Sequence, residues 1–314
     1  MIFLAQIEVK ILLFFSLKNK RLKRIAGIAA NYYFCKYTFV FKTKVIMQKN
    51  STLNCEKVND HIVKWLKTYA EKAKVNGFVI GISGGIDSAV TSTLCAQTGL
   101  TTLCVEMPIH QAQSHVNRAQ EHITQLKKRF PNVTDTRVDL TPVFEGFKIE
   151  VPSSDNEAKL HLSLANTRAR LRMTTLYYLA GIHGLLVAGT GNKVEDFGVG
   201  FFTKYGDGGV DLSPIADLMK SDVRALASYL SVPESILHAA PTDGLFGDDR
   251  SDEDQLGASY EELENAMNAL ENGKTADDFT GREKVVFEIY KRLNTVNQHK
   301  MNPIPVCVIP EKYK

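Results

Sequence analysis

Residues 79–89 constrain the fold of this chain more than any other stretch. They read Val-Ile-Gly-Ile-Ser-Gly-Gly-Ile-Asp-Ser-Ala and close an apolar, mostly β-branched run that starts at Phe78. A strand followed at once by a Ser/Gly turn and a helix-forming segment is typical of a parallel strand leading into a helix amino terminus. Unpaired amides and the helix dipole favour an anion there.

The turn has no lysine before its serine, so it is not a Walker A loop. Asp87 instead places a carboxylate in the first helical turn, where it could hold Mg²⁺ against a phosphate. The plain alternative is an ordinary strand, turn and helix in which Asp87 only caps the helix. The pattern predicts a phosphate site at this turn.

The chain beyond Cys55 alternates between helical and strand patterns, without internal repeats. Strands are expected over residues 78–82, 102–107, 133–139 and 185–190, and helices over 87–97, 113–130, 156–181, 220–230, 259–270 and 283–299. A further helix precedes the first strand, and its expected apolar face is Val58, Ile62, Trp65, Leu66, Tyr69 and Ala73. The pattern predicts an α/β fold: a doubly wound, mainly parallel sheet with helices on both faces and a helical carboxyl-terminal tail.

The first 46 residues differ from the rest. They hold nine Lys/Arg against the single acid Glu8, so that the remainder of a chain of net charge +3 carries about −5. The apolar run at 11–15 is too short to span a bilayer, and no signal-peptide pattern follows it. We expect residues 1–46 to be an atypical extension and 47–314, starting at Met47, to be the working domain; a membrane-associated anchor is the alternative.

The body has no basic face for nucleic acid. Its cysteines are scattered without a Cys-x-x-Cys pair and its histidines lack metal-ligand spacing, which indicates a cytoplasmic protein with reduced thiols.

A second stretch, residues 189–211, is too rich in glycine and charge for a structural crossover. It follows the last expected strand, and ligands in doubly wound sheets bind beyond the carboxyl ends of the strands. We therefore expect this loop and the turn at 83–88 to face one crevice.

Both stretches resemble a known family. The string Ser-Gly-Gly-Ile-Asp-Ser (83–88) resembles the pyrophosphate loop of N-type ATP pyrophosphatases. Gly-Thr-Gly-Asn-Lys-Val-Glu-Asp (189–196) and Phe-Phe-Thr-Lys-Tyr-Gly-Asp-Gly-Gly (201–209) are similar to ammonia-dependent NAD⁺ synthetases within that group. Further similar segments occur in the same order at 166–172, 213–214, 240–243, 251–257 and 299–300, so the resemblance covers roughly residues 50–305.

The resemblance implies an enzyme that uses ATP, Mg²⁺ and ammonia to amidate deamido-NAD⁺, yielding NAD⁺, AMP and pyrophosphate. It assigns catalysis to Asp87, Glu195 and Lys220, with Asp87 and Glu195 on the metal. It assigns ATP binding to Gly81, Ile82, Ser83, Gly84, Gly85, Ile86, Asp87, Ser88, Thr190, Lys220 and Thr242. It assigns deamido-NAD⁺ binding to Arg170, Lys204, Asp211, His299 and Lys300. The register of residues 196–200 stays open, because this segment varies in length among relatives.

Several alternatives stand beside this assignment. From pattern alone, Arg168, Arg170 and Arg172 would form a solvated helix face, and only the resemblance selects Arg170 as a ligand. Another N-type pyrophosphatase, such as the synthetase part of a GMP synthetase or a tRNA-thiolating enzyme, and a non-catalytic ATP-binding module are rival functions. Glutamine-dependent relatives carry a long amino-terminal glutaminase domain for which residues 1–46 leave no room, so we expect free ammonia as the nitrogen donor. The resemblance also implies a homodimer, and we expect neither nucleic acid nor membrane as a partner.

Overall fold

The computed structural model describes residues 53–241 and 251–314, which belong to one compact unit, Leu53–Lys314. The extension at 1–46, the proposed start Met47 and the candidate ATP contact Thr242 lie outside the described residues.

Four parallel strands form the sheet, in the order β3 (Val133–Arg137), β2 (Thr101–Glu106), β1 (Gly77–Gly81) and β4 (Leu185–Val187). In the register, Val79 of β1 lies opposite Leu103 of β2 and Val187 of β4. The chain moves outward from β1 to β3 and then returns to the other side of β1, so a topological switch point lies between β1 and β4. Such a point is where open α/β sheets bind ligands.

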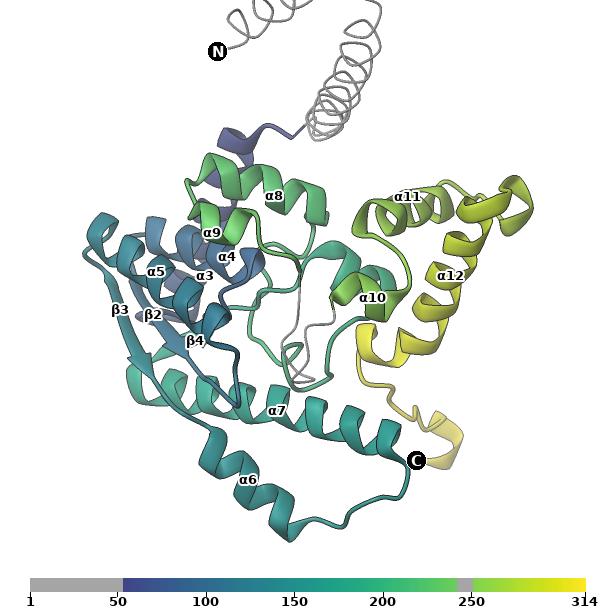
Figure 1. The fold of residues 1–314 in the computed structure, drawn as a ribbon, viewed down its shortest axis with the longest axis horizontal. Coiled ribbons are helices and arrows are strands. Elements are labelled where there is room, and N and C mark those ends of the chain that lie inside the picture. Colours follow the sequence, from purple (N-terminus) through teal and green to yellow (C-terminus); the bar gives the residue numbers. More distant parts are fainter. Residues whose placement is uncertain (1–52, 242–250) are drawn as a thin grey trace, which may run out of the picture. The chain divides into compact units, whose positions relative to one another are not determined.

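Helices cover both faces of the sheet, which confirms the predicted fold class (Figure 1). The side chains of Phe78 and Ile80 share one core with the helices on their side, whereas Val79 shares the other core with Phe144 and Ala180. This alternation follows from the period of two along a strand. The first group of helices is α3 (Cys55–Ala73), α4 (Ile86–Gln97), α5 (Gln113–Arg129), α8 (Lys220–Tyr229) and α9 (Glu234–Leu237); the second is α6 (Thr141–Glu150) and α7 (Glu157–His183).

The carboxyl-terminal helices build a separate core around the second loop. The π-helix η2 (Val194–Val199) contributes Val194 and Val199 to this core, where they pack with Tyr260, Phe287 and Tyr290. The helical segments here are α10 (Asp252–Leu256), α11 (Tyr260–Glu271), η3 (Ala276–Asp278), α12 (Gly281–Met301) and η4 (Glu311–Tyr313). The predicted tail is therefore one wall of the region that follows β4 (Figure 1).

The sequence prediction differs from the structure in two of the helices described so far. Trp65 and Tyr69 are 40% and 42% exposed and contact each other across one turn of α3, with ring centroids 5.7 Å apart, whereas Ile62 and Leu66 are buried. Residues four apart share a helix face, and Trp65 and Tyr69 lie at the edge of the face that Ile62 and Leu66 bury. Helix α6 was not predicted, because Phe144 is its only buried residue and its periodicity is weak. No helix in 53–241 or 251–314 is long and apolar enough to cross a membrane.

Candidate active site

The turn between β1 and α4 has the geometry of an anion-binding loop. Gly85 precedes α4 in an extended conformation, and no side chain caps the helix amino terminus. The hydroxyls shape the loop: the Ser83 oxygen accepts from the Gly85 N–H at 3.2 Å, and the Ser88 hydroxyl donates to the Gly85 carbonyl at 2.9 Å. The first amides of α4 thus stay available for a ligand.

Gly84 is the position where this loop requires glycine. Its φ is +81°, and a Cβ there would lie 2.5 Å from the backbone oxygen of His115. The first turn of α5 therefore packs directly on the loop, because no side chain separates the two backbones.

The three predicted catalytic residues meet beside this loop. The Lys220 ammonium lies 2.7 Å from Asp87 Oδ2 and 3.1 Å from Glu195 Oε1, and the residue is only 3% exposed. Burial alone would lower the pKa of Lys220, but the two carboxylates outweigh it and raise the pKa above its ordinary value. Asn192 donates to Asp87 Oδ1 at 3.1 Å and fixes that carboxylate. The two carboxylates thus favour the charged form of Lys220.

Tyr260 completes this cluster and was not predicted from the sequence. Its hydroxyl donates to Glu195 Oε1 at 2.5 Å and lies 3.4 Å from Asp252 Oδ2, while the Lys220 ammonium lies 4.6 Å from its ring centroid. Burial, and then the charge of Glu195, raise the pKa of Tyr260, so the hydroxyl stays protonated and donates. The only available signal was an aromatic residue shortly after the 251–257 segment of the resemblance.

Asp87 and Glu195 fit a magnesium ion that also binds phosphate. Mg²⁺ prefers oxygen ligands and usually takes one or two carboxylates, with water and substrate phosphates as the others. Among the described residues no group of three or more His, Cys, Asp or Glu side chains is placed to hold a metal, so the protein alone offers an incomplete shell. The Lys220 ammonium now lies between the two carboxylates. The donor chemistry fits Mg²⁺ only together with a ligand that brings further oxygens.

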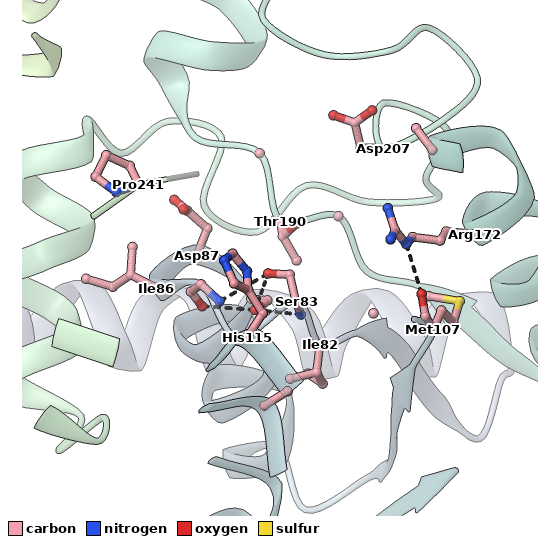
Figure 2. Close-up of a pocket in the computed structure, with 18 of the residues that line it drawn as sticks. Ile82, Ser83, Ile86, Asp87, Met107, His115, Arg172, Thr190, Asp207 and Pro241 are labelled. Carbon is pink, nitrogen blue, oxygen red and sulfur yellow. Dashed lines mark hydrogen bonds between the residues drawn. The ribbon is translucent and has the colours of Figure 1, made fainter. Parts of the chain in front are cut away.

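A cavity of about 290 Å³ lies over the loop (Figure 2). Its lining includes all of residues 81–88 together with Thr190, Glu195 and Lys220, which are candidate residues from the sequence. In Figure 2 the Asp87 and Thr190 side chains lie between Pro241 on one side and Arg172 on the other. Lining side chains that the sequence did not suggest are Glu106, Met107, Arg118, Arg137, Asp196 and Asp207.

The candidate deamido-NAD⁺ residues do not line this cavity. Arg170 donates to the Lys204 carbonyl at 3.3 Å, Lys204 Nζ donates to the His299 carbonyl at 2.5 Å, and Lys300 Nζ donates to Gly200 at 2.6 Å. These contacts tie the end of α12 to the loop after η2. Asp211 is apart from them, since it accepts from the Val187 N–H at 2.8 Å at the end of β4. Their role in dinucleotide binding stays a prediction.

The three arginines of α7 do not form the single solvated face that the pattern alone predicts. Arg172 donates to the Met107 carbonyl at 3.0 Å and to Gln111 at 2.9 Å, and it lines the cavity. Arg168 lies over the Phe144 ring, 4.3 Å from its centroid. The solvated-face prediction is wrong for these two because residues four apart share a helix face, here the face toward the sheet. Arg170 points elsewhere and is exposed at its hydrogen bonds.

The segment whose register was open is the π-helix η2, a rare form that is frequent at functional sites. Its wide turn carries Glu195 into the cavity and packs the Asp196 carboxylate against Gly191, where a Cβ would lie 2.2 Å from Oδ1. Burial, and then the charge of Glu195, raise the pKa of Asp196 to about 8. Asp207, the other acidic residue of this loop that lines the cavity, accepts from the Thr203 N–H at 2.9 Å. This loop thus adds two acidic side chains, besides Glu195, to the lining of the cavity.

Known proteins of one family are similar to this chain over most of its length. The family model described as NAD synthase matches residues 58–303. An NH₃-dependent NAD⁺ synthetase of Mesoplasma florum is 37% identical over 256 residues, which cover 81% of this chain and 96% of the relative. An NH₃-dependent NAD⁺ synthetase of Carboxydothermus hydrogenoformans is 34% identical over 249 residues, which cover 79% of this chain and 96% of the relative.

Two solved structures share the fold. An NMN synthetase from Francisella tularensis has a TM-score of 0.69 at 30% identity, covering 82% of this chain and 99% of that one. An NH₃-dependent NAD synthetase from Campylobacter jejuni, in complex with nitrate, has a TM-score of 0.66 at 24% identity, covering 82% and 100%. Together with the family match over most of its length, these relatives show that the chain belongs to the NAD synthase family.

Proposed function

We propose that this chain is an ammonia-dependent NAD⁺ synthetase, which joins ammonia to deamido-NAD⁺ and converts ATP to AMP and pyrophosphate. The observation that carries the proposal is the buried Lys220 ammonium between Asp87 and Glu195, directly beside an anion-binding loop. The family membership supplies the reaction class, and this cluster provides the charges that phosphoryl chemistry needs.

The reaction has two steps. A carboxylate oxygen of the nicotinate ring attacks the α-phosphorus of ATP, and the bond to the β-phosphate oxygen breaks, so that pyrophosphate leaves toward the 83–88 loop. Free amides of α4 and the Lys220 charge stabilise the leaving group as its charge grows. Ammonia then attacks the adenylated carbonyl carbon, loses a proton and expels AMP. No protein nucleophile is required.

Magnesium is part of the proposal. Asp87 and Glu195 would hold the ion together with phosphate oxygens, and Tyr260 and Asn192 orient these two carboxylates by donating to them. When bound, the ion supplies neutralisation of phosphate charge. The protein groups supply orientation and a site protected from bulk water.

Lys204, Arg170, His299 and Lys300 are proposed to bind the dinucleotide where the end of α12 meets the loop after η2. In support, hydrogen bonds link Arg170 to Lys204 and Lys204 to His299, and Lys300 donates to the Gly200 carbonyl. Three of the four side chains are basic, which suits an anionic substrate. Asp211 is proposed to take part in dinucleotide binding as well, and its contact with the Val187 N–H fixes it at the end of β4.

The finer features of the protein are also proposals. We propose a homodimer that uses the outer faces of α6 and α7, because apolar side chains are exposed there: Phe147, Leu162, Tyr178 and Ile182. We propose that residues 47–314 are the working domain, since the compact unit begins at Leu53 and the family match at residue 58. A cytoplasmic location is supported by four free cysteines among the described residues.

A second candidate substrate is the deamidated mononucleotide, which the 30% identity to an NMN synthetase favours. The chemistry would be the same, and the two substrates differ only in the adenylate half. Comparing kcat/KM for deamido-NAD⁺ and its mononucleotide analogue separates them.

The test of the proposed function is a product assay. The protein is incubated with ATP, Mg²⁺, ammonium and deamido-NAD⁺, and we expect NAD⁺, AMP and pyrophosphate in equal amounts. Reactions without ammonium, and with glutamine in its place, are the controls and should give little NAD⁺. Formation of ADP and phosphate, or no NAD⁺ from deamido-NAD⁺, would contradict the proposal.

A further inference from the structure

We propose that Arg118 of α5 is an additional phosphate-binding residue, which contacts the pyrophosphate half of ATP from the side of the loop that α5 covers. The inference rests on the proposed function, since it assigns a new contact within the same reaction. Neither the pattern of the loop nor the family resemblance points to this residue.

The geometry places Arg118 at the phosphate loop itself. Its Nε donates to the Gly84 carbonyl at 3.1 Å, and the residue lines the cavity together with all of the loop. This bond turns the carbonyl of Gly84 toward the guanidinium, so the partial negative charge of that oxygen is compensated. The close approach depends on the missing side chain of Gly84, because a Cβ there would lie 3.4 Å from Arg118 Cβ and closer still to the His115 backbone.

The terminal nitrogens of Arg118 are available for a ligand. Across residues 53–241 and 251–314 neither of them makes a hydrogen bond, and no carboxylate forms an ion pair with this guanidinium. Arg118 is half-buried, and burial lowers its pKa, so the charge is partly removed from water without an acidic partner. A planar group with free donors of this kind matches the oxygens of a phosphate.

Bound ATP brings more negative charge to the cavity than Lys220 can balance. Lys220 is shared by Asp87 and Glu195, so these three side chains together carry one net negative charge. The rest of the lining carries both signs: Glu106, Asp196, Asp207 and Asp252 are acidic, and Arg137, Arg172 and Arg224 are basic. Bound ATP adds several more negative charges to this site. Arg172 cannot take the same place, because its Nε and one terminal nitrogen donate to Met107 and Gln111 on the far side of the cavity.

Helix α5 also provides a matched control. Arg129 lies on the same helix and likewise donates to a backbone carbonyl, that of Leu230 at 3.0 Å, but it does not line the cavity. Removing either guanidinium takes one charge and one carbonyl contact from the same helix. Only removal of Arg118 takes a donor from the phosphate loop.

The test titrates inorganic pyrophosphate, in the presence of Mg²⁺, into the wild type and into Arg118→Gln, Arg118→Lys and Arg129→Gln. We expect Arg118→Gln to weaken pyrophosphate binding about tenfold or more and to raise KM for ATP similarly, with KM for deamido-NAD⁺ unchanged. Arg118→Lys, which keeps the charge without the fork, should be intermediate, and Arg129→Gln should bind as the wild type does.

Hydrogen exchange of the loop amides 83–88 in the ligand-free proteins separates a phosphate contact from support of the loop. The proposal expects equal exchange in the wild type and in both Arg118 variants. Unchanged pyrophosphate affinity in Arg118→Gln, or faster loop exchange that accompanies its loss of affinity, would overturn the proposal. A wild type that binds pyrophosphate but forms no NAD⁺ would refute the proposed function instead, and the titration would still decide the role of Arg118.

Discussion

Replacing Lys220 by methionine tests the central charge cluster. Methionine keeps much of the volume of the side chain but removes the ammonium, which leaves Asp87 and Glu195 facing each other in a buried site without their shared cation. Glu195 then keeps the hydrogen bond from Tyr260, and Asp87 keeps that from Asn192.

The expected loss of unfolding free energy follows from the burial of Lys220. Because Lys220 is 3% exposed and both of its partners are shielded, breaking the cluster should cost about 3–5 kcal/mol of unfolding free energy, as for one partner of a buried ion pair. A control substitution, Lys193→Met, removes the partly exposed lysine that lies 3.6 Å from Glu271, and it should cost about 1 kcal/mol or less. Turnover of Lys220→Met should fall at least about a hundredfold, the scale of one preorganised electrostatic group.

Urea unfolding with and without Mg²⁺ measures this effect. The two uncompensated carboxylates of Lys220→Met should bind the ion better than those of the wild type, so saturating Mg²⁺ should restore part of the lost stability in the variant and add less to the wild type or to Lys193→Met. The reasoning is that Lys220 holds the two carboxylates together at a site suited to a cation. It would be refuted if Lys220→Met were as stable as the wild type, or if Mg²⁺ did not change the free energy of unfolding of this variant.

Four other predictions concern separate parts of the molecule. Asp87→Asn should lower NAD⁺ formation at least about a hundredfold while the circular dichroism spectrum stays unchanged, and near-normal turnover would remove its role. His122 is buried against Ser92, and burial, with a smaller contribution from Arg129, lowers its pKa to about 4. As the pH falls, this histidine is therefore protonated in the unfolded chain before it is protonated in the folded one. Stability should therefore fall between pH 6.5 and 4 by about 3 kcal/mol more in the wild type than in His122→Gln, and parallel unfolding curves would contradict this. A chain that begins at Met47 should be folded and fully active; loss of either property would assign residues 1–46 to the working protein. Light scattering should give the mass of a dimer, and a monomer would exclude a site shared between subunits. If Arg170 acts across the interface, the inactive variants Asp87→Asn and Arg170→Ala should regain part of the activity when they are refolded together.

The sheet and the phosphate loop were predictable because local signals determine them. Apolar β-branched runs mark the strands, and glycines such as Gly84 mark the place where two backbones approach too closely for a side chain. The strand ends were predicted less well: β4 stops at Val187, since Gly189 pairs with Leu212 instead of with the sheet. The prediction that the turn at 83–88 and the loop at 189–211 face one crevice is confirmed, because β1 and β4 are neighbours and residues of both segments line the cavity.

The contacts between distant segments could not be predicted. The meeting of Tyr260 with Glu195 joins residues on α11 and η2, and that of Arg118 with Gly84 joins α5 to the loop. Nothing local in the sequence indicates such pairs, because each depends on how whole helices pack. The π-helix is similar: its wide turn is stabilised by the core that Val194 and Val199 share with the carboxyl-terminal helices.

The transfer of oxygen from the substrate carboxylate to AMP tests the account most directly. Deamido-NAD⁺ carrying ¹⁸O in its nicotinate carboxylate is converted with ATP, Mg²⁺ and ammonium, and the products are examined by mass spectrometry. If the carboxylate attacks the α-phosphorus beside the 83–88 loop, each AMP formed should carry one ¹⁸O and pyrophosphate none. Unlabelled AMP, or label in pyrophosphate, would contradict an adenylated carboxyl intermediate at this site.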